Sequence, residues 1–173
     1  MKAIKKAEKL ITLLSLGFMV VSLSVMGCGG GDETAPGSQP PGTSRSFGDG
    51  FSLLGGALDD IAAGGTGTTT CSGGGTKEIT DISLTQTRIV YNNCDGLSGD
   101  ITITDDGNSI VADGSMNFSS FNCSYTFNNF SQTLEGTDVI LNGGFTSNCG
   151  GASISCNFNN SVNLTQDVAN ACR

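Results

Sequence analysis

Seven cysteines carry the most distinctive chemistry in this chain of 173 residues. Cys28 stands alone near the N-terminus, and the other six form an even set, which is typical of a disulfide framework in an exported domain. A zinc site would need closely spaced cysteine pairs or histidines, but the chain has no histidine and its nearest cysteines lie seven residues apart. We therefore predict no metal, no cofactor, and disulfides among Cys71, Cys94, Cys123, Cys149, Cys156 and Cys172.

The pairing of these six cysteines is only partly predictable. Cys71 and Cys94 bracket a predicted hairpin over residues 77–93, so a Cys71–Cys94 bridge would tie one end of that hairpin to the preceding loop. Cys172 lies one residue from a C-terminus that would otherwise fray. Two arrangements stay open for the rest: Cys123–Cys149 with Cys156–Cys172, or Cys123–Cys156 with Cys149–Cys172.

Carboxylates are the other groups that could perform chemistry, because the lack of histidine excludes Ser-His-Asp and Cys-His catalysis. Glycosidases place two acids across the bond they cleave, so a carboxylate-dependent hydrolase is one hypothesis. Most of these acids stand beside Gly or Asn, however, where an Asx side chain commonly forms a turn, and residues 105–108 lack the spacing of an EF-hand loop. We therefore expect no enzymatic activity from the candidate acids: Asp59, Asp60, Asp81, Asp95, Asp100, Asp105, Asp106 and Asp113.

The number and positions of the charged residues help to predict whether the chain binds nucleic acid. The chain has a net charge of −8, and four of its eight basic residues lie within the first nine positions. Nucleic-acid binding depends on basic side chains that neutralise phosphates. Because the remaining basic residues are scattered, we expect no nucleic-acid partner.

The N-terminal region has the layout of a secretory signal peptide. Four lysines within residues 1–9 precede an apolar run over 10–26, which stops at Gly27-Cys28. The run is about 17 residues, at the lower limit for a membrane-spanning helix. A permanent transmembrane anchor is therefore the weaker interpretation.

Val25-Met26-Gly27-Cys28 resembles the lipobox of bacterial lipoproteins, although Met26 departs from its usual small or β-branched residue. The resemblance covers residues 1–28 only. It implies cleavage before Cys28 and attachment of acyl chains such as palmitate, so that the membrane is a partner of Cys28; more than one chain is needed for stable anchoring. The residue after Cys28 is Gly29 rather than the Asp that resembles an inner-membrane retention signal, which favours the outer membrane. Whether the domain faces the periplasm or the cell surface stays open.

The rest of the chain divides into two parts. Residues 28–50 are rich in Gly, Pro and Ser and predict a flexible tether. Residues 51–173 predict one β-domain, with a short helix over 51–63 that places Phe51, Leu54, Leu58 and Ile61 on one face. Residues 64–76 read as a Gly/Thr loop, and strands follow from about residue 77.

The strand region alternates with a period of two. FNCSYTFN (121–128) puts Phe121, Cys123, Tyr125 and Phe127 on one face, and SISCNFN (153–159) behaves in the same way. Turn signals separate such segments, at Asn92-Asn93, Asp95-Gly96, 105–108, Asp113-Gly114, Asn142-Gly143 and Gly150-Gly151. This pattern predicts an all-β fold: one antiparallel sandwich or barrel-like domain of short strands.

A faint repeat accompanies the alternation. The motifs YNNC (91–94), FNNF (127–130) and FNNS (158–161) each place two asparagines after an aromatic residue. Their unequal spacing favours a duplicated hairpin or meander unit over a solenoid.

Two surfaces of the predicted domain could bind a partner. The clustered aromatic residues could line a barrel pocket, so a carrier of a lipid or other apolar ligand is the alternative function. We favour instead a membrane-anchored, non-catalytic binding or structural component of the cell envelope. Its candidate surface for an envelope protein or glycan is the polar sheet face, made of Asn122, Ser124, Asn128, Ser155, Asn157 and Asn159.

Overall fold

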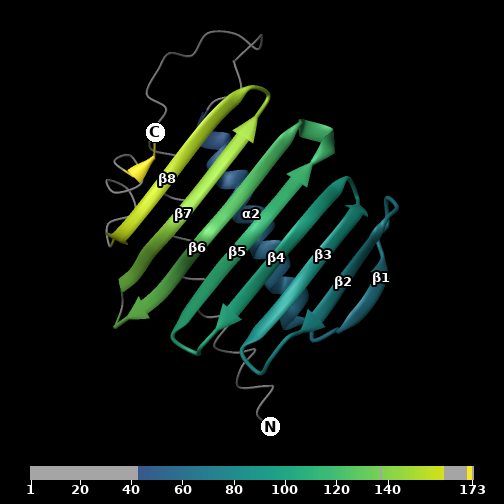
Figure 1. The fold of residues 1–173 in the computed structure, drawn as a ribbon, viewed down its shortest axis with the longest axis horizontal. Coiled ribbons are helices and arrows are strands. Elements are labelled where there is room, and N and C mark those ends of the chain that lie inside the picture. The colour runs from purple at the N-terminus through teal and green to yellow at the C-terminus, as the bar shows by residue number, and fades with distance from the viewer. Residues whose placement is uncertain (1–42, 137, 162–170, 173) are drawn as a thin grey trace.

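The computed structural model describes residues 43–136, 138–161 and 171–172 (Figure 1). The predicted signal peptide over 1–27 and the lipidation site Cys28 lie outside these residues. Within the described ranges, no helix is long and apolar enough to cross a membrane. The elements are helix α2 (Thr43–Ala62), the 3₁₀ turn η1 (Ser119–Phe121) and the strands β1 (Gly67–Thr70), β2 (Thr76–Asp81), β3 (Gln86–Cys94), β4 (Leu97–Asp105), β5 (Ser109–Phe118), β6 (Cys123–Glu135), β7 (Asp138–Cys149) and β8 (Ala152–Ser161).

The strands form one antiparallel sheet in which each strand pairs with the next along the chain, from β1 to β8. The sheet does not close on itself, and β1 and β8 are its edge strands. Helix α2 crosses behind the strands (Figure 1). On the free edge of β8, an isolated bridge pairs Cys156 with Cys172. The predicted all-β class, the antiparallel strands, the N-terminal helix and the disulfides are confirmed.

The core lies between helix α2 and the sheet face that the helix covers. Tyr125 and Phe127 point inward as the alternation predicted, with exposed fractions of 2% and 1%. The aromatic rings contact one another, and the centroids of Phe127 and Phe145 are 5.4 Å apart. These rings therefore fill the core. The side chains of Leu54, Ala57 and Leu58 complete it from the helix.

The helix begins at Thr43, not at residue 51 as predicted, so the predicted tether runs too far toward the domain. Its glycines suggested a flexible segment because glycine weakens helices. Gly50 is buried, however, and a Cβ there would lie 2.6 Å from a ring atom of Phe145 and 2.9 Å from one of Tyr125. Glycine at this position lets the helix approach the sheet closely. A second departure is strand β1, which forms within the predicted Gly/Thr loop.

The repeated Asn-Asn motifs turn out to be β-bulges. In β6, Phe127 pairs with Gly114 and Phe130 with Ala112, so Asn128 and Asn129 together face a single residue, Asp113. The same pattern of two residues against one occurs where Tyr91 pairs with Gly99 and Cys94 with Leu97. It occurs again where Phe158 pairs with Gly143 and Ser161 with Leu141.

Each bulge is held by the same hydrogen bond. The second asparagine adopts a left-handed conformation, with φ of 51° at Asn93, 47° at Asn129 and 51° at Asn160. Its N–H donates to a side chain on the neighbouring strand. The acceptors are Ser98 Oγ for Asn93 at 3.1 Å, Asp113 Oδ2 for Asn129 at 3.0 Å and Asn142 Oδ1 for Asn160 at 2.7 Å.

These bulges correct part of the turn prediction. Asn92-Asn93, Asp113-Gly114 and Asn142-Gly143 lie inside strands, because the left-handed residues that tight turns require also serve bulges. Asp95-Gly96, residues 106–108 and Gly150-Gly151 do connect consecutive strands. The unit occurs once in each of the hairpins β3–β4, β5–β6 and β7–β8, with the asparagines on the first strand of the first hairpin and on the second strand of the others.

Candidate functional site

Most of the candidate acids form hydrogen bonds or ion pairs within the fold. Seven of the eight accept hydrogen bonds from this chain's own groups: Asp60, Asp81, Asp95, Asp100, Asp105, Asp106 and Asp113. At the β4–β5 turn, for example, the N–H groups of Asn108 and Ser109 donate to Asp106 at 3.0 and 2.7 Å and lower the pKa of its carboxyl. Asp100 forms an ion pair with Arg88. These carboxylates shape turns and bulges, as an Asx side chain commonly does.

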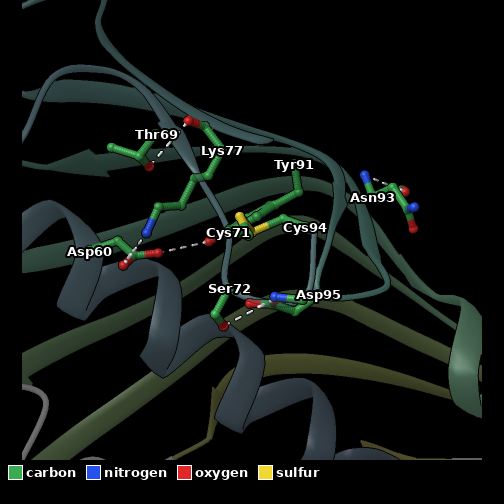
Figure 2. Close-up of a disulfide and its surroundings, with 11 residues drawn as sticks. Asp60, Thr69, Cys71, Ser72, Lys77, Tyr91, Asn93, Cys94 and Asp95 are labelled. Atoms are coloured by element: carbon green, nitrogen blue, oxygen red, sulfur yellow. Dashed lines mark hydrogen bonds and ion pairs between the residues drawn. A yellow bond between two sulfur atoms is a disulfide. The ribbon is translucent and has the colours of Figure 1, made fainter. Parts of the chain in front are cut away.

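Asp60 joins the last turns of helix α2 to the sheet (Figure 2). Lys77 Nζ lies 2.6 Å from Asp60 Oδ1, and the Tyr91 hydroxyl donates to Asp60 Oδ2 at 3.3 Å. Burial raises the pKa of Tyr91, and the neighbouring Asp60 carboxylate raises it further. The three side chains come from α2, β2 and β3 and satisfy one another. The cluster therefore fastens the helix to the sheet.

Three disulfides connect Cys71 with Cys94, Cys123 with Cys149, and Cys156 with Cys172. The predicted Cys71–Cys94 bridge is present, and of the two open arrangements the structure has the first. Beside Cys71–Cys94, the Asp95 carboxylate accepts hydrogen bonds from Ser72 Oγ and the Gly73 N–H (Figure 2). Cys71, Cys94 and Asp95 lie close enough together to suggest a metal site. Because both sulfurs are in the disulfide, they offer no thiolate to a metal.

The outer sheet face carries two rows of neutral polar residues over β5–β8. In the first, Asn117 pairs with Ser124, Ser124 with Asn148 and Asn148 with Ser153. In the second, Ser115 pairs with Thr126, Thr126 with Thr146 and Thr146 with Ser155. We call these eight residues the polar patch. All of them are exposed or half-buried.

The side chains of the polar patch are largely free of internal partners. The hydroxyls of Thr146 and Ser155 lie 3.5 Å apart. The other six side chains make no hydrogen bond within the part of the chain that the structure describes. The same face also holds charged residues beside the patch: Asp100, which pairs with Arg88, lies opposite Ser115, and Asp113 lies on β5.

A hollow of about 320 Å³ opens at the end of this patch. Asn117, Ser124 and Asn148 line both the patch and the hollow, and Phe118, Asn122 and the Cys123 end of a disulfide complete much of its wall. We call this feature the rim hollow. Among the residues that the structure describes, no ionisable side chain lines it.

The loops around the rim hollow are tied together. Asn122 ends the turn η1 with a left-handed φ of 49°, and its carbonyl accepts a hydrogen bond from the Gly150 N–H at 3.2 Å. The N–H of Ser119 donates to the carbonyl of Gly96 at 3.0 Å, which links this loop to the β3–β4 turn. The Cys123–Cys149 bridge joins the adjoining strand ends. The loops that form the hollow are thus held by two backbone hydrogen bonds and one disulfide.

Strand alternation correctly predicted that Ser124, Asn128, Ser155, Asn157 and Asn159 lie outside the core. Asn122 is also exposed, but it caps the turn η1 instead of standing in a strand. The rim hollow was not predicted, because it depends on loops that are distant in sequence. Across this chain, no protein-family model, curated protein or solved structure gives a match.

Proposed function

We propose that the chain is a bacterial lipoprotein, anchored to the outer membrane through Cys28, whose β-domain is a non-catalytic binding or structural component of the cell envelope. The lipobox-like sequence at 25–28 supports the anchor. The disulfides support an oxidising, exported location. The engagement of the acids in turns, bulges and ion pairs supports a function without carboxylate catalysis.

The observation that carries the binding function is the polar patch with its rim hollow. An acidic chain with a net charge of −8 presents eight neutral side chains side by side, six of them without an internal hydrogen bond in the described chain. Hydroxyl and amide groups in such rows offer donors and acceptors to an incoming molecule. A recess with convergent polar groups is the usual form of a binding site.

The binding surface can be tested with two matched substitutions. Thr126→Asp places a charge in the centre of the polar patch, whereas Thr80→Asp places the same charge on the exposed part of β2. The full chain, reconstituted in lipid nanodiscs, would be passed over immobilised envelope material of the producing bacterium. We expect Thr126→Asp to weaken binding at least tenfold and Thr80→Asp to leave it unchanged. Equal binding by both variants would contradict the assignment of this surface.

The anchor can be tested separately. Cys28→Ser removes the sulfur to which the acyl chains would attach, so we expect no incorporation of radiolabelled palmitate and no processed form in the detergent phase. A variant that still partitions into detergent with the processed mass would show that Cys28 is not the anchor.

A further inference from the structure

We propose that the rim hollow and the adjoining polar patch bind a neutral saccharide of the cell envelope. This inference rests on the proposed binding function and names the chemical class of its ligand.

Charge narrows the class of ligand. The overall negative charge of the chain disfavours the approach of anions. A cation would find no carboxylate among the residues that line the hollow. A neutral molecule is not repelled by the negative charge of the chain and needs no carboxylate partner. The described lining, which has no ionisable group, therefore suits a neutral ligand.

The side chains match the hydroxyls of a sugar. Each asparagine amide offers an acceptor oxygen and two donor hydrogens on adjacent atoms, which is the pattern that neighbouring sugar hydroxyls both supply and require. Asn117 and Asn148 both line the hollow, and Ser124 lies between them in the register. In the absence of a sugar, water solvates these two amides, so binding replaces water molecules with the hydroxyl groups of the sugar.

The lining also includes less polar residues. Phe118 and Cys123, which are half-buried and pack against the core, contribute to it beside the small residues Gly150 and Gly151. A sugar ring has a face of C–H groups as well as an edge of hydroxyls, and a site for it combines apolar lining with a few polar groups. A neutral peptide would also find hydrogen bonds here. The first row, however, consists only of short Asn and Ser side chains, which suit the closely spaced hydroxyls of a sugar better than the larger side chains of a peptide.

The register extends the site beyond one sugar unit. The row from Asn117 to Ser153 crosses four adjacent strands, about 14 Å at the usual strand spacing. An extended oligosaccharide could therefore follow the row away from the hollow, and its successive units would meet similar polar groups.

The test uses an array of neutral oligosaccharides of hexose and N-acetylhexosamine beside sulfated and uronic-acid-containing ones, probed with the full chain in nanodiscs. Asn117→Asp/Asn148→Asp keeps the side-chain shapes but replaces donors by charges. Asn108→Asp makes the same exchange in the β4–β5 turn at the opposite end of the sheet. We expect binding to a neutral oligosaccharide, a loss of at least tenfold in the double variant, and no change with Asn108→Asp.

Other outcomes separate the two proposals. Binding only to the acidic oligosaccharides, or to none on the array, overturns the saccharide inference. If the double variant nonetheless loses binding to envelope material, and protease but not periodate treatment of that material abolishes wild-type binding, the partner is a protein and the proposed function stands. If the double variant binds envelope material as the wild type does, the saccharide inference and the assignment of binding to this surface both fail.

Discussion

Tyr91 illustrates at the residue scale how one buried hydroxyl places an element. Its side chain is 6% exposed, and a buried hydroxyl without a partner is destabilising. The hydrogen bond to Asp60 supplies that partner from helix α2, 31 residues away in sequence. Lys77 pairs with the same carboxylate, so the negative charge of Asp60 is balanced where helix α2 meets the sheet.

The first prediction concerns Tyr91→Phe. At neutral pH the lost hydrogen bond should lower the free energy of unfolding by about 1 kcal/mol. The pKa of Tyr91 is raised from an ordinary value of 10.0, so the folded state keeps a proton that the unfolded state releases. The wild type should therefore lose stability as pH rises above 10.0, and Tyr91→Phe should lose less. Urea midpoints between neutral pH and pH 11 check this; equal slopes would contradict it.

At the scale of elements, the bulges decide which faces meet. Between residues 131 and 135, β6 pairs regularly with β7, and continuing that register without the bulge would place Cys123 opposite Gly150. The additional residue in β6 instead brings Cys123 opposite Cys149. Because a one-residue slip moves every side chain to the other face, the bulge at which Asn129 and Phe130 of β6 face Gly143 of β7 is what allows this disulfide.

Gly143 provides a test of that bulge. Its φ is +88°, and a Cβ would lie 2.1 Å from the Asn129 carbonyl oxygen. Gly143→Ala should therefore lower the free energy of unfolding by about 3 kcal/mol, from left-handed strain together with overpacking. Gly150→Ala is the control, since its φ is +58° but nothing lies within 4 Å; it should cost about 1 kcal/mol. Denaturant titration compares the two, and equal losses would show that the contact with Asn129 is unimportant.

The two faces of β6 can be compared at adjacent positions. Phe127 is 1% exposed and Thr126 is exposed. Phe127→Asp should cost more than about 4 kcal/mol, because it buries an unpaired charge, and Thr126→Asp should change the free energy of unfolding by less than about 0.5 kcal/mol. Thermal midpoints measure the difference. Similar midpoints would mean that the strand does not separate a dry face from a wet one.

At the scale of the whole molecule, the described residues form an open sheet with one covering helix, and this arrangement needs additional constraints. Helix α2 covers the inner face of the sheet. Gly50 of the helix lies against Phe145, and Asp60, further along the helix, pairs with Lys77. Two disulfides lie near the loops at one end of the sheet, and the third attaches the C-terminal residues 171–172 to the edge of β8. Such covalent links add to the stability that the core supplies.

The last prediction separates the contributions of two disulfides. Cys123→Ser/Cys149→Ser and Cys71→Ser/Cys94→Ser should each lower the free energy of unfolding by about 2–4 kcal/mol, since they close loops of similar length, 26 and 23 residues. Only the first pair borders the rim hollow. Saccharide binding should therefore weaken in Cys123→Ser/Cys149→Ser alone, measured under conditions in which both variants are folded. Equal binding losses would argue that the hollow is not the site.

The sequence by itself determined the features that depend on local pattern. Alternation from Tyr125 to Phe127 assigns faces because side chains of a strand point to opposite sides. The even cysteine set predicted a disulfide framework, and the spacing of Leu54 and Leu58 predicted a helix with one buried face. The faces and the helix concern residues that are close along the chain, and the disulfide framework follows from the number of cysteines alone.

Only the tertiary structure decided the features that depend on distant contacts. Gly50 reads as a flexible residue until the rings of Tyr125 and Phe145 are seen against it. Asp113-Gly114 reads as a turn until the Asn129 N–H is seen to donate to that aspartate. The pairing of Cys123 with Cys149 depends on a bulge that shifts the register by one residue. In each case the same local residues satisfy two conformations, and packing against another strand or helix selects between them.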